Sequence, residues 1–231
     1  LGIRTNRNSC GMDLMCALLG KAPYFGLMTD EGRRATWLIE VKTSGEPDWG
    51  VLGGAIGEKC VEDVPYIIGI DKYFDGQITP ENVHMMKAMG AATASSGAVG
   101  LYHVENLTPD ALDHGRDLLA KGYQTYVIDD AEIDRVRNAF PNLWPKNVKK
   151  PNRAYIGCPH NTDHEMVLWG TRIHDELEKR GLEKVAIPTH MFSATVVRNR
   201  MFHEHPVLTR DLHKAGVTFS NTCTVCFSGL K

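Results

Sequence analysis

The chain alternates short apolar runs with helix-length segments, and this order constrains the possible folds more than any other feature. Strands are predicted over residues 35–43, 64–70, 98–104, 126–128, 153–156, 185–187 and 217–219. Strands that alternate with helices of ten or more residues favour a mostly parallel sheet covered by helices on both faces. The predicted fold class is therefore α/β, with a three-layer αβα arrangement.

Capping residues mark the ends of the predicted helices. Ser9 precedes one helix and Gly20 ends it, and Thr162 with Glu165 forms the T-x-x-E pattern of a capping box. Pro80 and Pro109 each follow a threonine, which is typical of a helix start. Helices are predicted over residues 10–19, 80–89, 109–121, 131–140, 166–180, 193–202 and 206–215, with a glycine-dense helix over 49–60 that allows close backbone approach.

Composition limits the functional classes. The 231 residues are 42% hydrophobic and carry a net charge of −2, so the chain suits one large domain or two small ones. No basic cluster supports a nucleic-acid or membrane-surface partner, and no apolar run reaches transmembrane length. Six cysteines are too sparse for a disulfide scaffold, which favours a reducing cytoplasm. Because the chain starts at Leu1 without a signal pattern, we expect truncation at both ends.

The stretch from residue 157 to 165 concentrates reactive groups between a predicted strand and a predicted helix. It contains Cys158 and His160 beside the capping box, at a sheet edge where ligands collect in α/β proteins. Cys223 leaves the last predicted strand in the same way. If both strands are parallel, the two thiols reach the same edge. The alternative is that Cys158 is an ordinary small core residue.

Three chemistries are compatible with these thiols. A zinc site can use Cys158, His160, Cys223 and Cys226, although no paired C-x-x-C framework is present. A redox C-x-x-C at residues 223–226 is conceivable, but no following helix is predicted to lower the thiol pKa. An iron–sulfur cluster held by cysteines from distant loops is the third. Spacing alone does not rank them.

Two further segments are candidates for anion contacts. Arg4 lies with Asn6 in a polar loop before the first helix, where a guanidinium can bind a carboxylate or phosphate. Lys87, Ser95 and Ser96 flank a run of small residues that lets a ligand approach the backbone. A solvated loop and a tight turn with hydroxyl caps are the alternative interpretations.

Four motifs in order resemble the aconitase X family over nearly the whole chain. They are Arg4-Thr-Asn-Arg7, the run from Lys87 to Gly97 followed by Tyr102-His103, Gly157-Cys-Pro-His160 with Glu165, and Asn221-Thr-Cys223. The resemblance implies an aconitase-like catalytic domain of a hydro-lyase. Members dehydrate small hydroxy acids such as cis-3-hydroxy-L-proline or mevalonate 5-phosphate.

The resemblance also implies roles for particular residues. Cys158 and Cys223 match cysteines that ligate an iron–sulfur cluster, and His160 would assist the leaving group or orient a cluster ligand. The implied catalytic and substrate contacts are Lys87, Ser96, Arg4, Asn6 and Ser95. Residues 1–150 would form the first part of the catalytic region, and residues 151–231 would carry the cluster cysteines.

Some of the family pattern is not found in this sequence. The third cluster cysteine is expected upstream of Leu1, and a swivelling small domain or small subunit is expected to close the site. This part of the enzyme alone is therefore expected to lack activity. Asn8 replaces an acidic residue of many members, which bears on the substrate. The rival hypothesis is a zinc-stabilised binding module without catalysis.

Overall fold

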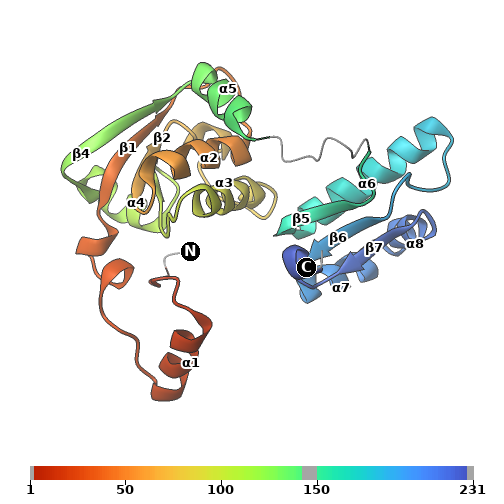
Figure 1. Cartoon of the computed structure of the whole chain (residues 1–231), viewed down its shortest axis with the longest axis horizontal. Helices are drawn as coiled ribbons and strands as arrows, with labels where there is room; N and C mark the ends of the chain where they lie inside the picture. The colour runs from red at the N-terminus through yellow and green to blue at the C-terminus, as the bar shows by residue number, and fades with distance from the viewer. Residues whose placement is uncertain (1–2, 142–149, 228–231) are drawn as a thin grey trace. The chain divides into compact units, whose positions relative to one another are not determined.

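The computed structural model describes residues 3–141 and 150–227 and divides into two compact units (Figure 1). Unit 1 comprises Leu1–Thr79 and Met85–Pro141, and unit 2 comprises Pro80–His84 and Asn142–Lys231. Each unit contains one parallel sheet with helices packed on it. The α/β class with parallel strands is confirmed. The described strands form two sheets, one in each unit.

The sheet of unit 1 has the strand order β3-β2-β1-β4, and all of its pairs are parallel. Ile39 at its centre pairs with Ile67 on one side and with Tyr126 on the other. The strands are β1 (Ala35–Val41), β2 (Pro65–Ile68), β3 (His103–Val104) and β4 (Leu119–Ile128). Central β1 is buried on both faces, which explains its largely apolar sequence.

Helices cover both faces of this sheet. On one face, Ile39 packs with residues of α2 (Trp49–Cys60), α3 (Val83–Ser96) and α5 (Asp130–Ala139) in a single core. On the other face, Leu38 and Tyr66 pack against Ala111 of α4 (Pro109–His114). Adjacent residues of a strand point to opposite faces, so β1 supplies both cores. Unit 1 therefore has the predicted three layers.

Glycines let α2 and α3 approach closely, as the sequence predicts. A Cβ added at Gly53 would lie 2.3 Å from the carbonyl oxygen of Met89, and one at Gly57 would lie 2.7 Å from that of Thr93. Gly90, predicted to end α3, instead lies inside the helix, where a Cβ would meet the ring of Tyr102 at 3.1 Å. This glycine serves helix packing, and the helix continues to Ser96.

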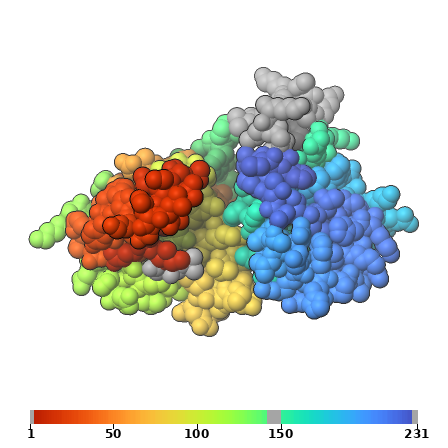
Figure 2. Space-filling view, turned by 90° about the horizontal axis from the view of Figure 1, so that it is seen from below, coloured from red at the N-terminus to blue at the C-terminus, as the bar shows by residue number. Residues whose placement is uncertain are grey.

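The N-terminal segment, whose atoms are red in Figure 2, carries a well-capped helix. Helix α1 (Cys10–Leu19) starts and ends as predicted, because the Ser9 hydroxyl accepts the Met12 N–H and Gly20 adopts a left-handed conformation. No residue of α1 is buried within the described part of the chain. Four short 3₁₀ helices complete unit 1, at Gly26–Met28, Glu31–Arg33, Asp71–Tyr73 and Gly115–Leu118.

Unit 2 is built on the three-stranded sheet β5-β6-β7, again parallel throughout. Met191 lies at the centre of its core with Met166, Met201, Leu212 and Val217. The elements are β5 (Ala154–Asn161), α6 (Asp163–Arg180), β6 (Thr189–Ser193), α7 (Thr195–Glu204), α8 (Pro206–Lys214), β7 (Val217–Ser220) and α9 (Thr224–Phe227). Helices α6, α7 and α8 all contribute to this one core, so they share a face of the sheet.

Three further secondary-structure predictions are wrong. The helix predicted over 109–121 ends at His114, and its last residues belong to edge strand β4, whose exposed residues lack apolar alternation. The strand predicted over 185–187 lies instead at Thr189–Ser193, beyond Pro188. The strand predicted over 98–104 is reduced to His103–Val104. Among the described residues, no helix has the length and apolar character needed to cross a membrane.

Candidate thiolate site

Cys158 lies in a bulge of β5. Ile156 pairs with Met191 and Asn161 with Ser193, so five steps along β5 match only two along β6. The three extra residues leave the ladder and expose Cys158. Gly157 opens the bulge with φ of +125°, and Asn161 bridges it by donating its side-chain N–H to the Ile156 carbonyl at 3.0 Å. The predicted reactive loop is thus a rigidly braced bulge within the strand.

Cys223 follows β7 and caps the short helix α9. Its carbonyl accepts the Phe227 N–H at 2.8 Å, and its sulfur accepts hydrogen bonds from the backbone N–H groups of Cys226 and Val225. These bonds, with one from the Cys226 thiol, lower the pKa of the Cys223 thiol. The expectation that no helix follows Cys223 is therefore wrong, because the four residues of α9 supply the donors.

Two hydrogen bonds connect the segments that carry the cysteines. The Thr224 hydroxyl donates to the Gly157 carbonyl at 3.0 Å. Nε2 of His160 donates to the Thr222 carbonyl at 3.2 Å. Each bond joins a residue next to Cys223 with the segment around Cys158. The structure thus brings Cys158, His160 and Cys223 together, although β6 separates their strands in the sheet.

An aromatic cluster holds α9 against the sheet face opposite the helical core. Phe227 packs on His190 and Phe192 with ring centroids 4.9 and 5.1 Å apart, and on Tyr155 at 6.1 Å. Nδ1 of His190 lies 2.6 Å from the Thr218 hydroxyl, and burial together with Arg153 lowers the pKa of His190. This cluster was not predicted, because its rings come from three separate segments of the sequence.

The thiol environment fits a soft metal or an iron–sulfur cluster. Both cysteines are exposed and unpaired by a disulfide, and Cys223 is held in surroundings that favour a thiolate. Within the described residues, Cys158, His160 and Cys223 do not bring three donor atoms within 4.8 Å of one another. In the described part of the chain, a closed zinc site made of these side chains is therefore not preformed, and the arrangement presents two exposed cysteines to a further ligand or group.

Cys60 contrasts with these thiols and provides a test of the site. It is 2% exposed in the core of unit 1, where burial and the nearby Asp63 raise its pKa to about 12. Under native conditions we expect iodoacetamide to modify Cys223 and the exposed Cys10 while Cys60 stays unmodified, because the thiolate is the reactive form. Peptide mass spectrometry after timed quenching measures this, and labelling of Cys60 at the rate of Cys10 would contradict it.

Arg4 and Asn6, predicted substrate contacts, hold the N-terminal segment in unit 1. Arg4 pairs with Asp30 at 2.5 Å and donates to the Met28 carbonyl at 3.0 Å. The Asn6 side chain donates to the Phe25 carbonyl at 2.9 Å and accepts the Leu27 N–H at 2.6 Å. Both side chains are engaged within the protein. Their roles as substrate contacts stay predictions.

Helix α3 carries the other predicted contacts, Lys87, Ser95 and Ser96. Ser95 and Ser96 are exposed in its last turn, and the Ser95 hydroxyl donates to the Ala92 carbonyl at 3.2 Å. Nine helical steps separate Lys87 from Ser96, which places them about 13 Å apart along the axis on opposite sides of the helix. One small ligand therefore does not bridge these two side chains on α3. Their roles stay predictions as well.

A cavity of about 270 Å³ lies beside Arg4 in unit 1. Its wall contains the buried ion pair of Arg33 and Asp110, whose closest atoms are 2.6 Å apart. Arg33 is 5% exposed, and its carbonyl accepts a hydrogen bond from Nε2 of buried His103 at 2.8 Å. Burial lowers the pKa of His103. The cavity wall contains both positive and negative side chains. Its buried arginine, Arg33, is already paired with Asp110.

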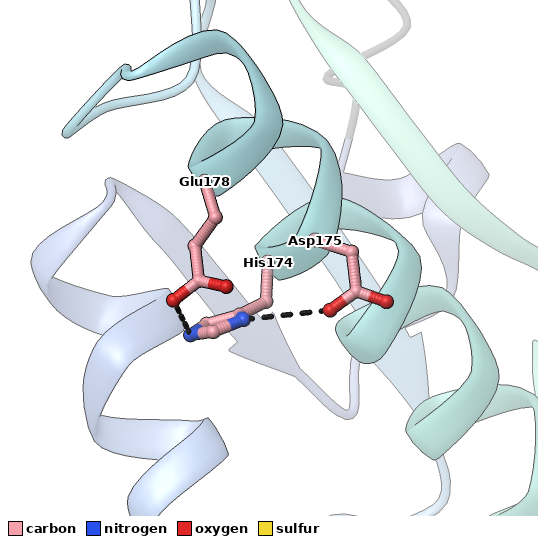
Figure 3. A group of neighbouring side chains, drawn as sticks. All are labelled: His174, Asp175 and Glu178. Carbon is pink, nitrogen blue, oxygen red and sulfur yellow. Dashed lines mark ion pairs between the residues drawn. The ribbon is translucent and has the colours of Figure 1, made fainter.

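A group of possible metal ligands on α6 was not singled out by the sequence (Figure 3). Nδ1 of His174 lies 3.6 Å from Asp175, while Nε2 lies 3.8 Å from Glu178. The two carboxylates thus face different nitrogens of one ring, so they orient the imidazole instead of converging with it on one point. Both carboxylates are exposed. This arrangement is that of neighbouring polar side chains on the surface of one helix.

The fold and site define the class of protein as a parallel α/β protein with two exposed cysteine thiols at the carboxyl end of a sheet. Residues 35–138 match the family description "Aconitase X second domain". The crystal structure of Thermococcus kodakaraensis aconitase X in its holo-form superposes with a TM-score of 0.75 at 29% identity, over 97% of this chain and 53% of that chain.

Characterised relatives support the same assignment. The phosphomevalonate dehydratase large subunit of Thermococcus kodakarensis is 32% identical over 200 residues, which are 86% of this chain and 46% of the relative. The cis-3-hydroxy-L-proline dehydratase of Pseudomonas aeruginosa is 40% identical over 185 residues, which are 77% of this chain and 30% of the relative. The chain spans less than half the length of these relatives. Over most of its length the chain is similar to members of the aconitase X family.

Proposed function

We propose that the chain is part of a hydro-lyase that removes water from a small hydroxy acid, with Cys158 and Cys223 as ligands of an iron–sulfur cluster. The observation that carries the proposal is the pair of exposed thiols on two hydrogen-bonded segments at one edge of a parallel sheet. The dehydratase relatives supply the reaction class. Six free cysteines among the described residues agree with a reducing cytoplasm as its location.

The two cysteines differ in how the chain prepares them. Cys223 is held as a hydrogen-bond acceptor by the N–H groups of Val225 and Cys226, whereas Cys158 projects from the bulge that Gly157 opens. A bound cluster with an open iron would supply a Lewis acid for the departing hydroxyl. The hydrogen bonds of His160 and Thr224 would hold the two sulfurs at a fixed separation.

His160 acts in this proposal as a positioning residue. Its Nε2 donates to the Thr222 carbonyl, the residue before Cys223, so the ring fixes one ligand segment relative to the other. Groups that orient metal ligands are commonly found just outside the ligand shell. Of the two roles implied by the family resemblance, this contact favours orienting a cluster ligand over assisting the leaving group.

The substrate is proposed to be a hydroxy acid of the kind used by the relatives, either cis-3-hydroxy-L-proline or mevalonate 5-phosphate. Arg4, Asn6, Lys87, Ser95 and Ser96 are the proposed substrate contacts. Because Arg4 is paired with Asp30, it would have to exchange that carboxylate for the substrate anion. A small subunit or swivelling small domain is the proposed partner, as the name "large subunit" of one relative suggests.

Metal analysis tests the proposal directly. We expect the chain purified without oxygen and reconstituted with iron and sulfide to retain both, and to show the visible absorption of an iron–sulfur cluster. Cys158→Ser and Cys223→Ser should each lose the iron, while the matched variant Cys10→Ser on α1 keeps it. Equal iron in all four proteins would contradict the cluster assignment. Stoichiometric zinc without sulfide would instead favour the zinc-stabilised binding module.

A further inference from the structure

Cys223 has a second sulfur beside it. Cys226 lies one helical turn further on, and its thiol donates a hydrogen bond to the Cys223 sulfur. Both residues are exposed. Side chains three positions apart at a helix start lie on the same side, within the Cα separation that a disulfide can span. The pair therefore has the proximity and access that a disulfide requires.

We propose that Cys223 and Cys226 form a reversible disulfide that controls the thiolate site. Formation of this bond is independent of any metal. Its consequence rests on the proposed function, because an oxidised Cys223 has no thiolate to offer a cluster. The site would then exist in a reduced, metal-competent form and an oxidised form that does not bind the cluster.

The reaction needs an oxidant, and a small disulfide such as oxidised glutathione supplies it. The Cys223 sulfur, which accepts the hydrogen bonds, attacks one sulfur of the oxidant, breaks its S–S bond and releases one glutathione thiolate. Cys226 then loses its proton to solvent and attacks the Cys223 sulfur, releasing the second glutathione. Two protein thiols lose two electrons and two protons, and the oxidant is reduced to two thiols.

Cys158 is the competing partner for Cys223. The two segments are connected through the Thr224 hydroxyl and the His160 ring, so a bond between Cys158 and Cys223 is the rival product. The spacing of three residues at the start of α9 favours the bond between Cys223 and Cys226. Cys60 is buried in unit 1 and does not compete.

Peptide mapping separates the two products. After incubation with oxidised glutathione and alkylation, trypsin releases both cysteines of the pair in residues 215–231, whereas Cys158 lies in residues 154–172. We expect residues 215–231 to appear lighter by two hydrogen atoms, with no cross-link to residues 154–172. In Cys226→Ser the internal bond should be lost and glutathione should remain on Cys223. A Cys158–Cys223 cross-link in the wild-type chain, or wild-type Cys223 that remains glutathionylated, would overturn the proposal.

Measuring iron and sulfide uptake by the reduced and the oxidised chain tests the disulfide separately from the proposed function. We expect the reduced wild-type chain to take up iron and sulfide and the oxidised chain to lose that capacity, whereas Cys226→Ser treated with glutathione and then reduced takes them up. Cys10→Ser should behave like the wild type throughout. If the internal disulfide forms but no form of the chain binds iron, the proposed function fails and the disulfide stands. If iron binds but the disulfide never forms, the inference fails alone.

Discussion

Replacing Gly157 with alanine is expected to lower the free energy of unfolding of unit 2 by about 3 kcal/mol or more. At φ of +125° the backbone is in a region that side chains rarely allow, and the added Cβ would lie 2.4 Å from the Phe192 carbonyl oxygen. Because the Phe192 carbonyl belongs to the backbone of β6, relief requires β5 to move away from β6. The bulge that presents Cys158 would change shape with it.

Gly181→Ala is the matched control for this prediction. Gly181 also has a positive φ, of +63°, but no atom lies within 4 Å of the Cβ that alanine would add. We expect it to cost about 1 kcal/mol from the backbone conformation alone. Hydrogen exchange of peptides from β5 and β6 in increasing urea measures both variants. Similar losses in the free energy of unfolding for the two variants would show that the contact with Phe192 does not destabilise Gly157→Ala.

Arg33→Met is expected to lower the free energy of unfolding of unit 1 by about 3 to 5 kcal/mol. The arginine is 5% exposed and pairs with Asp110 at 2.6 Å, so its removal leaves a half-buried carboxylate without its main partner. Methionine retains much of the aliphatic volume, which limits the contribution of lost packing. Urea unfolding followed by hydrogen exchange of β1 peptides measures the loss.

Arg137→Met is the control for the ion pair. Arg137 pairs with Asp134 at 2.7 Å, but their side chains are 49% and 67% exposed. Water screens such a pair, and we expect a change below about 0.5 kcal/mol. The double variant Arg33→Met with Asp110→Leu should recover part of the stability, because it removes both charges. A loss as large in Arg137→Met as in Arg33→Met would contradict the assignment to burial.

Helix ends that are fixed by capping residues can be predicted from the sequence. The capping box of Thr162 and Glu165 forms with hydrogen bonds in both directions, and α6 ends at Gly181 as expected. Helix α1 has both predicted ends. Each of these helix ends depends on residues a few positions apart, so the spacing of the capping residues in the sequence is enough to predict it.

Sequence patterns do not predict elements whose conformation depends on contacts with distant parts of the chain. Strand β4 pairs only with β1 at the sheet edge, and its exposed residues give no periodic pattern. Gly122, which directly follows the helix predicted over 109–121, lies in β4 where the register with β1 shifts. Gly90 similarly signals a helix end but accommodates the Tyr102 ring. A glycine permits several conformations, and only its neighbours decide which one is used.

The candidate site shows the same division. The sequence places Cys158 and Cys223 at strand ends that share one edge of a sheet, and parallel pairing with β6 brings them there. It does not reveal the contact of His160 with Thr222, because 62 residues separate them. It also misses the engagement of Asn6 by Phe25 and Leu27. Hydrogen bonds between segments far apart in the chain produce no recognisable pattern in the sequence.

The bulge in β5 separates the reactive residues from the architecture of unit 2. Pairing with β6 resumes at Asn161, so Cys158, Pro159 and His160 lie outside the ladder that registers the core. Substitutions among these three residues can alter the chemistry without changing which side chains face the helices. The core of unit 2 and its reactive segment therefore depend on different residues of the same strand.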